Sequence, residues 1–440
     1  MKSRFVLITV LLMLIGFMAR PPLAAQENEL EFQRSEQLVY VWAGQSDTIP
    51  PFVLSPAGLD PQTPTANITV NYIGSWTGPA QNAFEYAVTI WEGLLVSTVA
   101  IKVNAEWSGS LPPGALGGAG PYDFYGNFPN SPQANTWYPI ALANTYAGYD
   151  LNGSDPEVDS VFSSTFSNWY FGTDGNTPGG TYDFVTVVLH ELGHGLGFTG
   201  SMRVQGGLGN WGYGSTYPFI YDRFTENGAG QALLSFPNNS GALASQLTGG
   251  SVYFDGPNAN AANSGSRPRL YAPGTWQQGS SYSHLDESTF PGGTTNALMT
   301  PQISSGEANH NPGPIALGIF KDSGWTLANQ NTAPVMNPLP SQLMLVGTTR
   351  NNAIDLWAYT SDAQTPDSAL VFAITNSPNA NAGVSLDSNR YIDVFPAGAW
   401  TGSTLVTVRV TDPGGLTHSQ SFTVAVVNQI LNAYLPMVQK

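Results

Sequence analysis

Glycine and proline interrupt this chain so often that long regular elements can form in only a few places. The 48 glycines and 33 prolines among 440 residues exceed the share of roughly 12 % that the two types hold in an average protein. We therefore expect many turns, short strands and few long helices, spread over two or three domains at this length. Because 42 % of the residues are hydrophobic and 12 % are aromatic, the composition excludes an intrinsically disordered chain.

Two segments nevertheless keep the spacing of an amphipathic helix. Within residues 80–95 apolar side chains recur every three or four positions, and strand-like segments precede them at 68–73 and follow them at 99–103. This order predicts a strand–helix–strand unit, the usual beginning of a mixed sheet with a backing helix. A second helix is predicted over 184–194, with Asp183 as its N-cap and glycines at its end.

The rest of the first 330 residues is predicted to be poor in regular structure. Residues 109–140 are rich in glycine and proline and indicate a loop, and one strand is expected at 158–162. Residues 198–330 are expected to be mostly loop as well, with a short helix at 315–322 after a Pro-Gly-Pro sequence. We therefore expect an α+β domain over residues 65–330.

The pattern changes beyond a linker at 331–340 that is rich in proline and asparagine. Six or seven short apolar runs follow, separated by turns, which is typical of an all-β sandwich. We expect this domain to span 331–428 and to be followed by a short apolar tail at 429–440. Its pattern resembles the Ig-like or cadherin-like modules of secreted bacterial proteins.

The N-terminal segment predicts export from the cell. Lys2 and Arg4 precede a 15-residue apolar run, and small residues follow it, which is the pattern of a secretory signal peptide at 1–25. The run is short for a membrane span and no later run approaches 18 residues, so no span is expected in the mature chain. Residues 26–64 are polar and contain several prolines, and we interpret them as a poorly structured leader or short propeptide.

Charge and cysteine content exclude several functions. A net charge of −16 argues against nucleic acid and anionic lipid as partners. The absence of cysteine excludes disulfides, thiolate metal sites and cysteine nucleophiles, so bound cations are an alternative source of stability outside the cell. Two groups of side-chain oxygens are candidates for Ca²⁺, although neither has the spacing of an established calcium loop and solvated turns would explain both: Asp150, Asn152, Asp155 and Asp159, and Asp174, Asn176 and Asp183.

The strongest chemical signal is the sequence His190-Glu191-Leu192-Gly193-His194 in the second predicted helix. Histidines four positions apart lie one turn above each other on the same helix face, where both can bind one metal ion. Glu191 would then lie beside the metal and accept a proton from an activated water molecule.

A catalytic zinc site needs a third protein ligand and a free position for water. His284 is the first candidate, and Asp222 and Glu226 compete with it because they lie nearer to the helix in sequence. The gap of 90 residues before His284 costs roughly 2.4 kcal/mol more in loop closure than a six-residue gap, which is small beside the order of 10 kcal/mol from a zinc site. His310 is interpreted as a surface loop residue and His418 as a bystander in the sandwich.

Residues 190–198 are similar to the long motif of the metzincin peptidases, and Gly197 matches its glycine. The third histidine of the short metzincin pattern falls at Gly200 here, so the sequence departs from that pattern. It resembles the leishmanolysin-like branch better, because a long insertion there precedes the third histidine, which would be His284. The sequence Ala-Leu-Met-Thr-Pro around Met299 looks like the methionine turn that lies under the metal in this clan.

The resemblance covers residues 65–326 and implies a metzincin-like catalytic domain, with a mixed twisted sheet, a backing helix and an active-site helix. It also implies zinc bound by His190, His194 and His284, with Glu191 as the general base and proteins or peptides as substrates. The sequence therefore predicts a secreted zinc-dependent endopeptidase.

Two other functions fit parts of the sequence. An extracellular adhesion or polysaccharide-binding protein with a structural or inactive metal site would explain the sandwich, but it leaves Glu191 without a role. A zinc amidase or deacetylase of cell-wall material would fit the metal motif but not the resemblance to peptidases. Tyr282, two residues before His284, is expected to pack in the core rather than to stabilise an oxyanion. The sequence does not constrain the oligomeric state.

Overall fold

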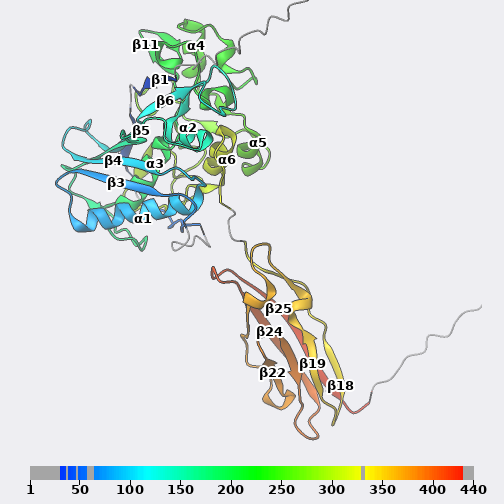
Figure 1. Ribbon diagram of the computed structural model, residues 1–440. Coiled ribbons are helices and arrows are strands. Elements are labelled where there is room, and N and C mark those ends of the chain that lie inside the picture. The colour runs from blue at the N-terminus through cyan, green and yellow to red at the C-terminus, as the bar shows by residue number, and fades with distance from the viewer. Residues whose placement is uncertain (1–29, 36–37, 46–47, 57–63, 329–331, 430–440) are drawn as a thin grey trace, which may run out of the picture.

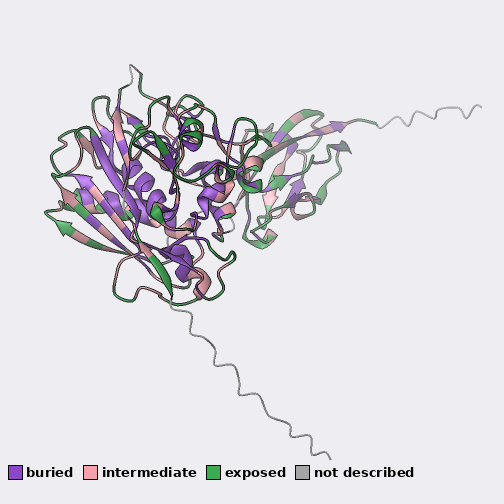
Figure 2. Ribbon diagram, turned by 90° about the horizontal axis from the view of Figure 1, so that it is seen from above, coloured by how far each residue is buried: buried purple, intermediate pink, exposed green. Residues whose placement is uncertain are grey.

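The protein is an α+β structure that forms two bodies (Figure 1), and each body contains an extensive hydrophobic core. The larger core extends from Val41 to Trp325 and the smaller from Met336 to Val426, and buried residues fill the interior of both bodies (Figure 2). The signal peptide predicted at 1–25 and nearly all of the predicted tail lie outside the described residues, and no described helix is long and apolar enough to cross a membrane. The computed structural model describes residues 30–35, 38–45, 48–56, 64–328 and 332–429.

A six-stranded mixed sheet forms the centre of the larger body. Its strand order is β16-β2-β5-β8-β4-β3. The strands β3, β4 and β8 run parallel, β5 runs antiparallel to both β8 and β2, and β16 runs parallel to β2. The bounds are β2 Val39–Gly44, β3 Ile68–Gly74, β4 Ile101–Ser108, β5 Ala115–Pro121, β8 Val158–Ser163 and β16 Gln302–Ser304.

The predicted strand–helix–strand unit is confirmed by β3, α1 (Gly78–Leu94) and β4. Thr77 caps α1 by accepting a hydrogen bond from the Ala80 amide, and a proline in the first turn suits the helix start. The apolar face of α1 buries Trp91, whose indole N–H donates to the carbonyl of Leu189. This bond ties α1 to the second predicted helix, which the structure also contains as α3 (Phe184–Gly195).

The prediction of a poorly structured leader is wrong for Val39–Gly44, because these residues form β2 in the middle of the sheet. Val39 and Val41 alternate with less buried neighbours, which is the pattern of a strand with one buried face. A further strand, β1 (Glu31–Arg34), pairs antiparallel with β6 (Asp123–Gly126). The N-terminal segment is therefore part of the larger body as the structure describes it.

The prediction of a loop at 109–140 is also wrong, since this segment contains β5, β6 and β7 (Tyr138–Pro139), followed by α2 (Ile140–Ala147). Every residue of β5 is buried although its sequence is Ala-Leu-Gly-Gly-Ala-Gly-Pro. The glycines allow neighbouring side chains to pack directly against the backbone of β5. A Cβ at Gly118, for example, would lie only 2.5 Å from the ring of Tyr40. Because glycine has a low β-propensity, the sequence of this segment does not indicate a strand.

Residues 198–328 contain mostly loops and short elements, as predicted. The predicted helix at 315–322 is present as α6 (Gly313–Ser323), while α4 (Gly241–Leu247) and α5 (Pro257–Ala262) were not predicted. The remaining strands of this body are β9 Trp169–Tyr170, β10 Tyr182–Asp183, β11 Arg203–Gln205, β12 Leu208–Asn210, β13 Thr225–Asn227, β14 Val252–Phe254 and β15 Arg269–Leu270.

The smaller body consists of two sheets around one core. The four-stranded sheet has the order β18-β25-β24-β21 and the three-stranded sheet has the order β19-β23-β22, with a short β17–β20 pair beside them. Side chains from both sheets meet in the smaller core, which is the packing expected for a β-sandwich. The bounds are β17 Val335–Met336, β18 Gln342–Leu345, β19 Arg350–Asp355, β20 Thr360–Ser361, β21 Val371–Ile374, β22 Val384–Asp387, β23 Tyr391–Val394, β24 Gly402–Thr411 and β25 Thr417–Val427.

Candidate metal centre

Three buried histidines converge at one point in the larger body. The Nε2 atoms of His190 and His194 lie 2.9 Å apart, and each lies 3.2 Å from the Nε2 atom of His284. Nitrogens that share one tetrahedral zinc ion at 2.0–2.1 Å lie about 3.3 Å apart, so the spacing fits a common ion. Within the described residues this is the only group of three His, Asp or Glu side chains that could hold a metal.

Each imidazole is oriented by a backbone carbonyl on its other nitrogen. The Nδ1 atoms of His190, His194 and His284 lie 2.6, 2.7 and 2.7 Å from the carbonyl oxygens of their partners, which are Leu298, Phe198 and Ser280. A carbonyl can only accept, so Nδ1 carries the proton in all three rings and the Nε2 lone pairs face one another. Three lone pairs pointed together repel unless a cation lies between them, so the donor set fits a bound metal ion.

Burial keeps the three histidines neutral. It lowers the pKa of His190 to about 4, although the bond to the Leu298 carbonyl acts in the opposite direction. Burial also lowers the pKa of His194 and His284 well below the ordinary value, and the neighbouring imidazoles add to the effect. Neutral imidazole is the form that binds zinc and other transition metals.

The helix α3 sets the positions of the first two histidines. Its N-terminus is capped by Asp183, which accepts from the Thr186 amide at 2.8 Å, and all twelve of its residues are buried. The helix ends where Gly197 takes a φ of +123°, a conformation that favours glycine. The turn brings the carbonyl of Phe198 back to the ring of His194.

The third histidine arrives on a loop held by backbone hydrogen bonds. The Tyr271 amide donates to the carbonyl of His284, and the Leu285 amide donates to the carbonyl of Met299 at 2.8 Å. Gly200, where the short metzincin pattern has its histidine, leaves no room for one, because a Cβ there would lie 2.1 Å from the ring of Tyr282. The Gly200 amide instead donates to the hydroxyl of a serine next to His284.

Met299 lies directly against the helix that carries the histidines. It is fully buried, and a Cβ at Gly193 would lie 2.9 Å from its sulfur. The preceding residue, Leu298, supplies the carbonyl that orients His190. The segment predicted to be a methionine turn therefore both packs under α3 and orients one histidine.

Glu191 lies between α3 and the sheet, with its side chain across β5. A Cβ at Gly117 would lie 3.0 Å from its Cγ. Its Oε1 accepts from the Val41 amide at 3.1 Å. Its Oε2 is buried without a hydrogen-bond partner among the described residues. Burial raises the pKa of Glu191 well above its ordinary value.

The competing ligands lie elsewhere. Asp222 is buried, but its carboxylate accepts from the Phe219 amide, from Ser201 and from the hydroxyl of Tyr282. Glu226 forms an ion pair with Arg267 at 2.7 Å. Neither carboxylate belongs to the histidine group. The hydroxyl of Tyr282 is held within this network, which agrees with the packing role predicted for it.

The prediction that His310 is a surface residue is wrong, because its side chain is fully buried. Its Nε2 lies 2.9 Å from a carboxylate oxygen of Asp183, and Phe52 packs against its ring. His310 therefore helps to fix the start of α3. A histidine between two asparagines gave no apolar context from which this burial could be predicted.

Aspartates in both candidate calcium groups accept hydrogen bonds within the chain, whereas Oδ1 of Asn152 is buried without a partner among the described residues. Asp150 accepts from the amides of Asn152 and Gly153 and forms an ion pair with Lys102. Asp174 accepts from the hydroxyl of Tyr170 and from a neighbouring asparagine. These contacts are typical of turns, so the geometry gives calcium no specific support here.

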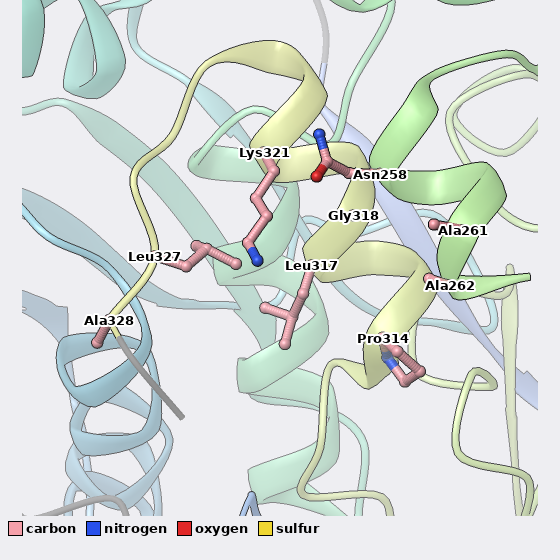
Figure 3. Close-up of a pocket in the computed structure, with 9 residues that line it drawn as sticks. All are labelled: Asn258, Ala261, Ala262, Pro314, Leu317, Gly318, Lys321, Leu327 and Ala328. Atoms are coloured by element: carbon pink, nitrogen blue, oxygen red, sulfur yellow. The ribbon is translucent and has the colours of Figure 1, made fainter. Parts of the chain in front are cut away.

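A pocket of about 420 Å³ lies between α5 and α6 (Figure 3). Its lining is mostly apolar and carries one charged side chain, Lys321. No residue of the histidine group lines it, so the pocket is separate from the metal centre.

Comparison with known proteins adds no assignment. No protein-family model matches the chain, and no match is found among curated proteins.

Proposed function

We propose that this chain is a secreted zinc-dependent endopeptidase with a metzincin-like catalytic domain and a C-terminal Ig- or cadherin-like module. The observation that carries the proposal is the group of three imidazoles, each oriented by a backbone carbonyl. Two of them lie on the helix that also carries Glu191, and His284 joins them from a distant loop. A site with three protein ligands leaves one position for water or substrate, as in catalytic rather than structural zinc sites. Proteins or peptides outside the cell are the substrates that the resemblance implies.

In the proposed reaction the three histidines would bind the metal ion and Glu191 would transfer the proton. A zinc ion bound by the histidines would supply Lewis acidity to a substrate carbonyl and to a water molecule. Glu191 would accept the proton of the attacking water and deliver it to the leaving amine. Its unpartnered Oε2 is the atom available for this transfer, and the nearby positive charge would lower the high pKa that burial alone gives it.

Substitution of Glu191 by Gln tests this role. We expect Glu191→Gln to keep one zinc ion per chain, because no ligand is changed, and to lose at least about 100-fold in casein cleavage, because the proton acceptor is gone. The control is Glu226→Gln, which removes a carboxylate outside the site and should keep both metal and activity. Zinc is measured by elemental analysis, and phenanthroline should abolish cleavage by the wild type. Full activity of a zinc-loaded Glu191→Gln variant would refute the assignment.

One observation favours the alternative of an inactive or structural metal site in an adhesion or polysaccharide-binding protein. All three histidines and Glu191 are fully buried, so a macromolecular substrate has no access to them in this conformation. That function predicts no casein cleavage by the wild type or by any variant, at any zinc loading.

A further inference from the structure

The strand β2 lies against the buried metal centre. Glu191, the three histidines and Val41 each have no exposed surface. The Val41 amide donates to Oε1 of Glu191, so the backbone of β2 holds the proposed general base directly. If the chain is a peptidase, this strand has to leave before a substrate can enter.

Within the sheet β2 lies between β5 and β16, and it also contacts the segment that leads to the third ligand. On one side it pairs antiparallel with β5, with Val41 opposite Gly117. On the other side the Tyr40 amide donates to the carbonyl of Gly279, and the indole N–H of Trp42 donates to the Ser280 hydroxyl at 2.8 Å. The carbonyl of the same serine orients the ring of the third histidine. The strand therefore joins both walls of the centre.

The space around β2 is suited to an extended peptide. Backbone hydrogen bonds join β2 to β5 and to the opposite wall, and any peptide in the same conformation can form them. The glycines of β5 leave room for the side chains of the inserted strand, as at Gly118 beside the Tyr40 ring. A hollow of about 360 Å³ next to Trp42, between Ser280 and Gln302, extends this space beyond the strand.

We propose that residues 38–45 are an intramolecular inhibitor that occupies the place of an extended substrate on β5 and holds the Glu191 carboxylate through the Val41 amide. This inference rests on the proposed peptidase function. It supplies a means of latency in a chain without cysteine, in which no thiolate can block the metal. Displacement of β2 would expose the edge of β5 and release Oε1 of Glu191 at the same time.

The test weakens the interactions that hold β2 in the sheet, and it leaves the metal ligands and the general base unchanged. In the full chain, Tyr40→Ala combined with Trp42→Ala removes one ring packed on Gly118 and one bond to Ser280. We expect dipicolinate to extract zinc at least about tenfold faster from this double variant than from the wild type, and casein cleavage to rise. Phe32→Ala is the control, because this exposed residue of β1 lies in the same N-terminal segment and should leave both rates unchanged.

A synthetic peptide provides the reverse experiment. The peptide Leu-Val-Tyr-Val-Trp-Ala-Gly-Gln, which has the sequence of residues 38–45, should slow zinc extraction from the double variant and inhibit its cleavage of casein. A scrambled peptide should have no effect. The effect of Glu191→Gln on casein cleavage is then measured again in the double variant, in which β2 no longer suppresses activity.

The possible outcomes distinguish a failure of the inhibitor proposal from a failure of the peptidase proposal. Faster zinc extraction that the peptide reverses, without any casein cleavage, supports β2 as the segment that closes the metal centre but refutes the peptidase, and with it the inhibitor. Casein cleavage with equal extraction rates in wild type and double variant refutes the inhibitor and leaves the peptidase standing. If the double variant fails to fold, hydrogen exchange of the wild type decides: amides of β2 should exchange faster than those of β4, and equal protection overturns the proposal.

Discussion

At the scale of single residues, the three imidazoles owe their positions to different parts of the chain. His190 and His194 meet because residues four positions apart lie on the same face of a helix. The convergence of His284 depends on backbone bonds over residues 271–299, which have no local pattern in the sequence. For the same reason, the sequence does not indicate the three carbonyls that orient the rings, which belong to Ser280, Phe198 and Leu298.

The third ligand is tested most directly by metal content. We expect His284→Ala to lose most of its zinc on gel filtration, because two imidazoles remain where three fix the ion and losing even an outer partner of a ligand costs 10–100-fold in affinity. His418→Ala, in the smaller body, should keep a full complement. Elemental analysis measures both, and far-UV circular dichroism verifies that they are folded. Undiminished zinc in His284→Ala would place the third ligand elsewhere.

At the scale of elements, prediction succeeded where the signal was local. The helices α1 and α3 have apolar periodicity and a side-chain N-cap within a few residues. The strand β5 was missed because its glycines serve contacts to β2 and Glu191 rather than strand propensity. The alternation within Val39–Gly44 was readable, but prolines nearby at 50 and 51 led to the prediction of an unstructured leader.

Glu157, between β4 and α2, predicts a pH-dependent stability. It accepts from the Lys102 amide and from the side chain of Asn144. Burial raises its pKa to about 7, although the amide and the ammonium group of Lys102 act in the opposite direction. The ordinary value is 4.5, so the folded state binds the proton more tightly than the unfolded chain. The favourable contribution is fully present below about pH 4.5 and is lost as the pH rises through 7.

We therefore expect Glu157→Gln, which stays neutral, to gain stability relative to the wild type between pH 4.5 and pH 8, by on the order of 2 kcal/mol. Urea unfolding at the two pH values measures the difference. Glu106→Gln, on the exposed side of β4, should show little change in this comparison. A constant difference between Glu157→Gln and wild type at both pH values would contradict the prediction.

At the scale of the whole molecule, the metal centre belongs to only one of two cores. Its ligands lie on α3 and on the loop before Met299, which both pack in the larger core. The smaller core draws on Met336 to Val426 and shares no residue with the larger one. A ligand that binds only the folded form of one unit raises the free energy of unfolding of that unit and leaves the other unit unchanged.

Zinc removal should therefore affect one of two thermal unfolding transitions. At a zinc concentration of about 1,000 times the dissociation constant the gain is about 4 kcal/mol, which for a body of this size corresponds to about 10 °C. We expect a chelator to lower one calorimetric transition by roughly this amount and to leave the other in place. His284→Ala should show the lowered transition without chelator. A single transition, or an equal shift of two, would mean that the bodies unfold as one unit.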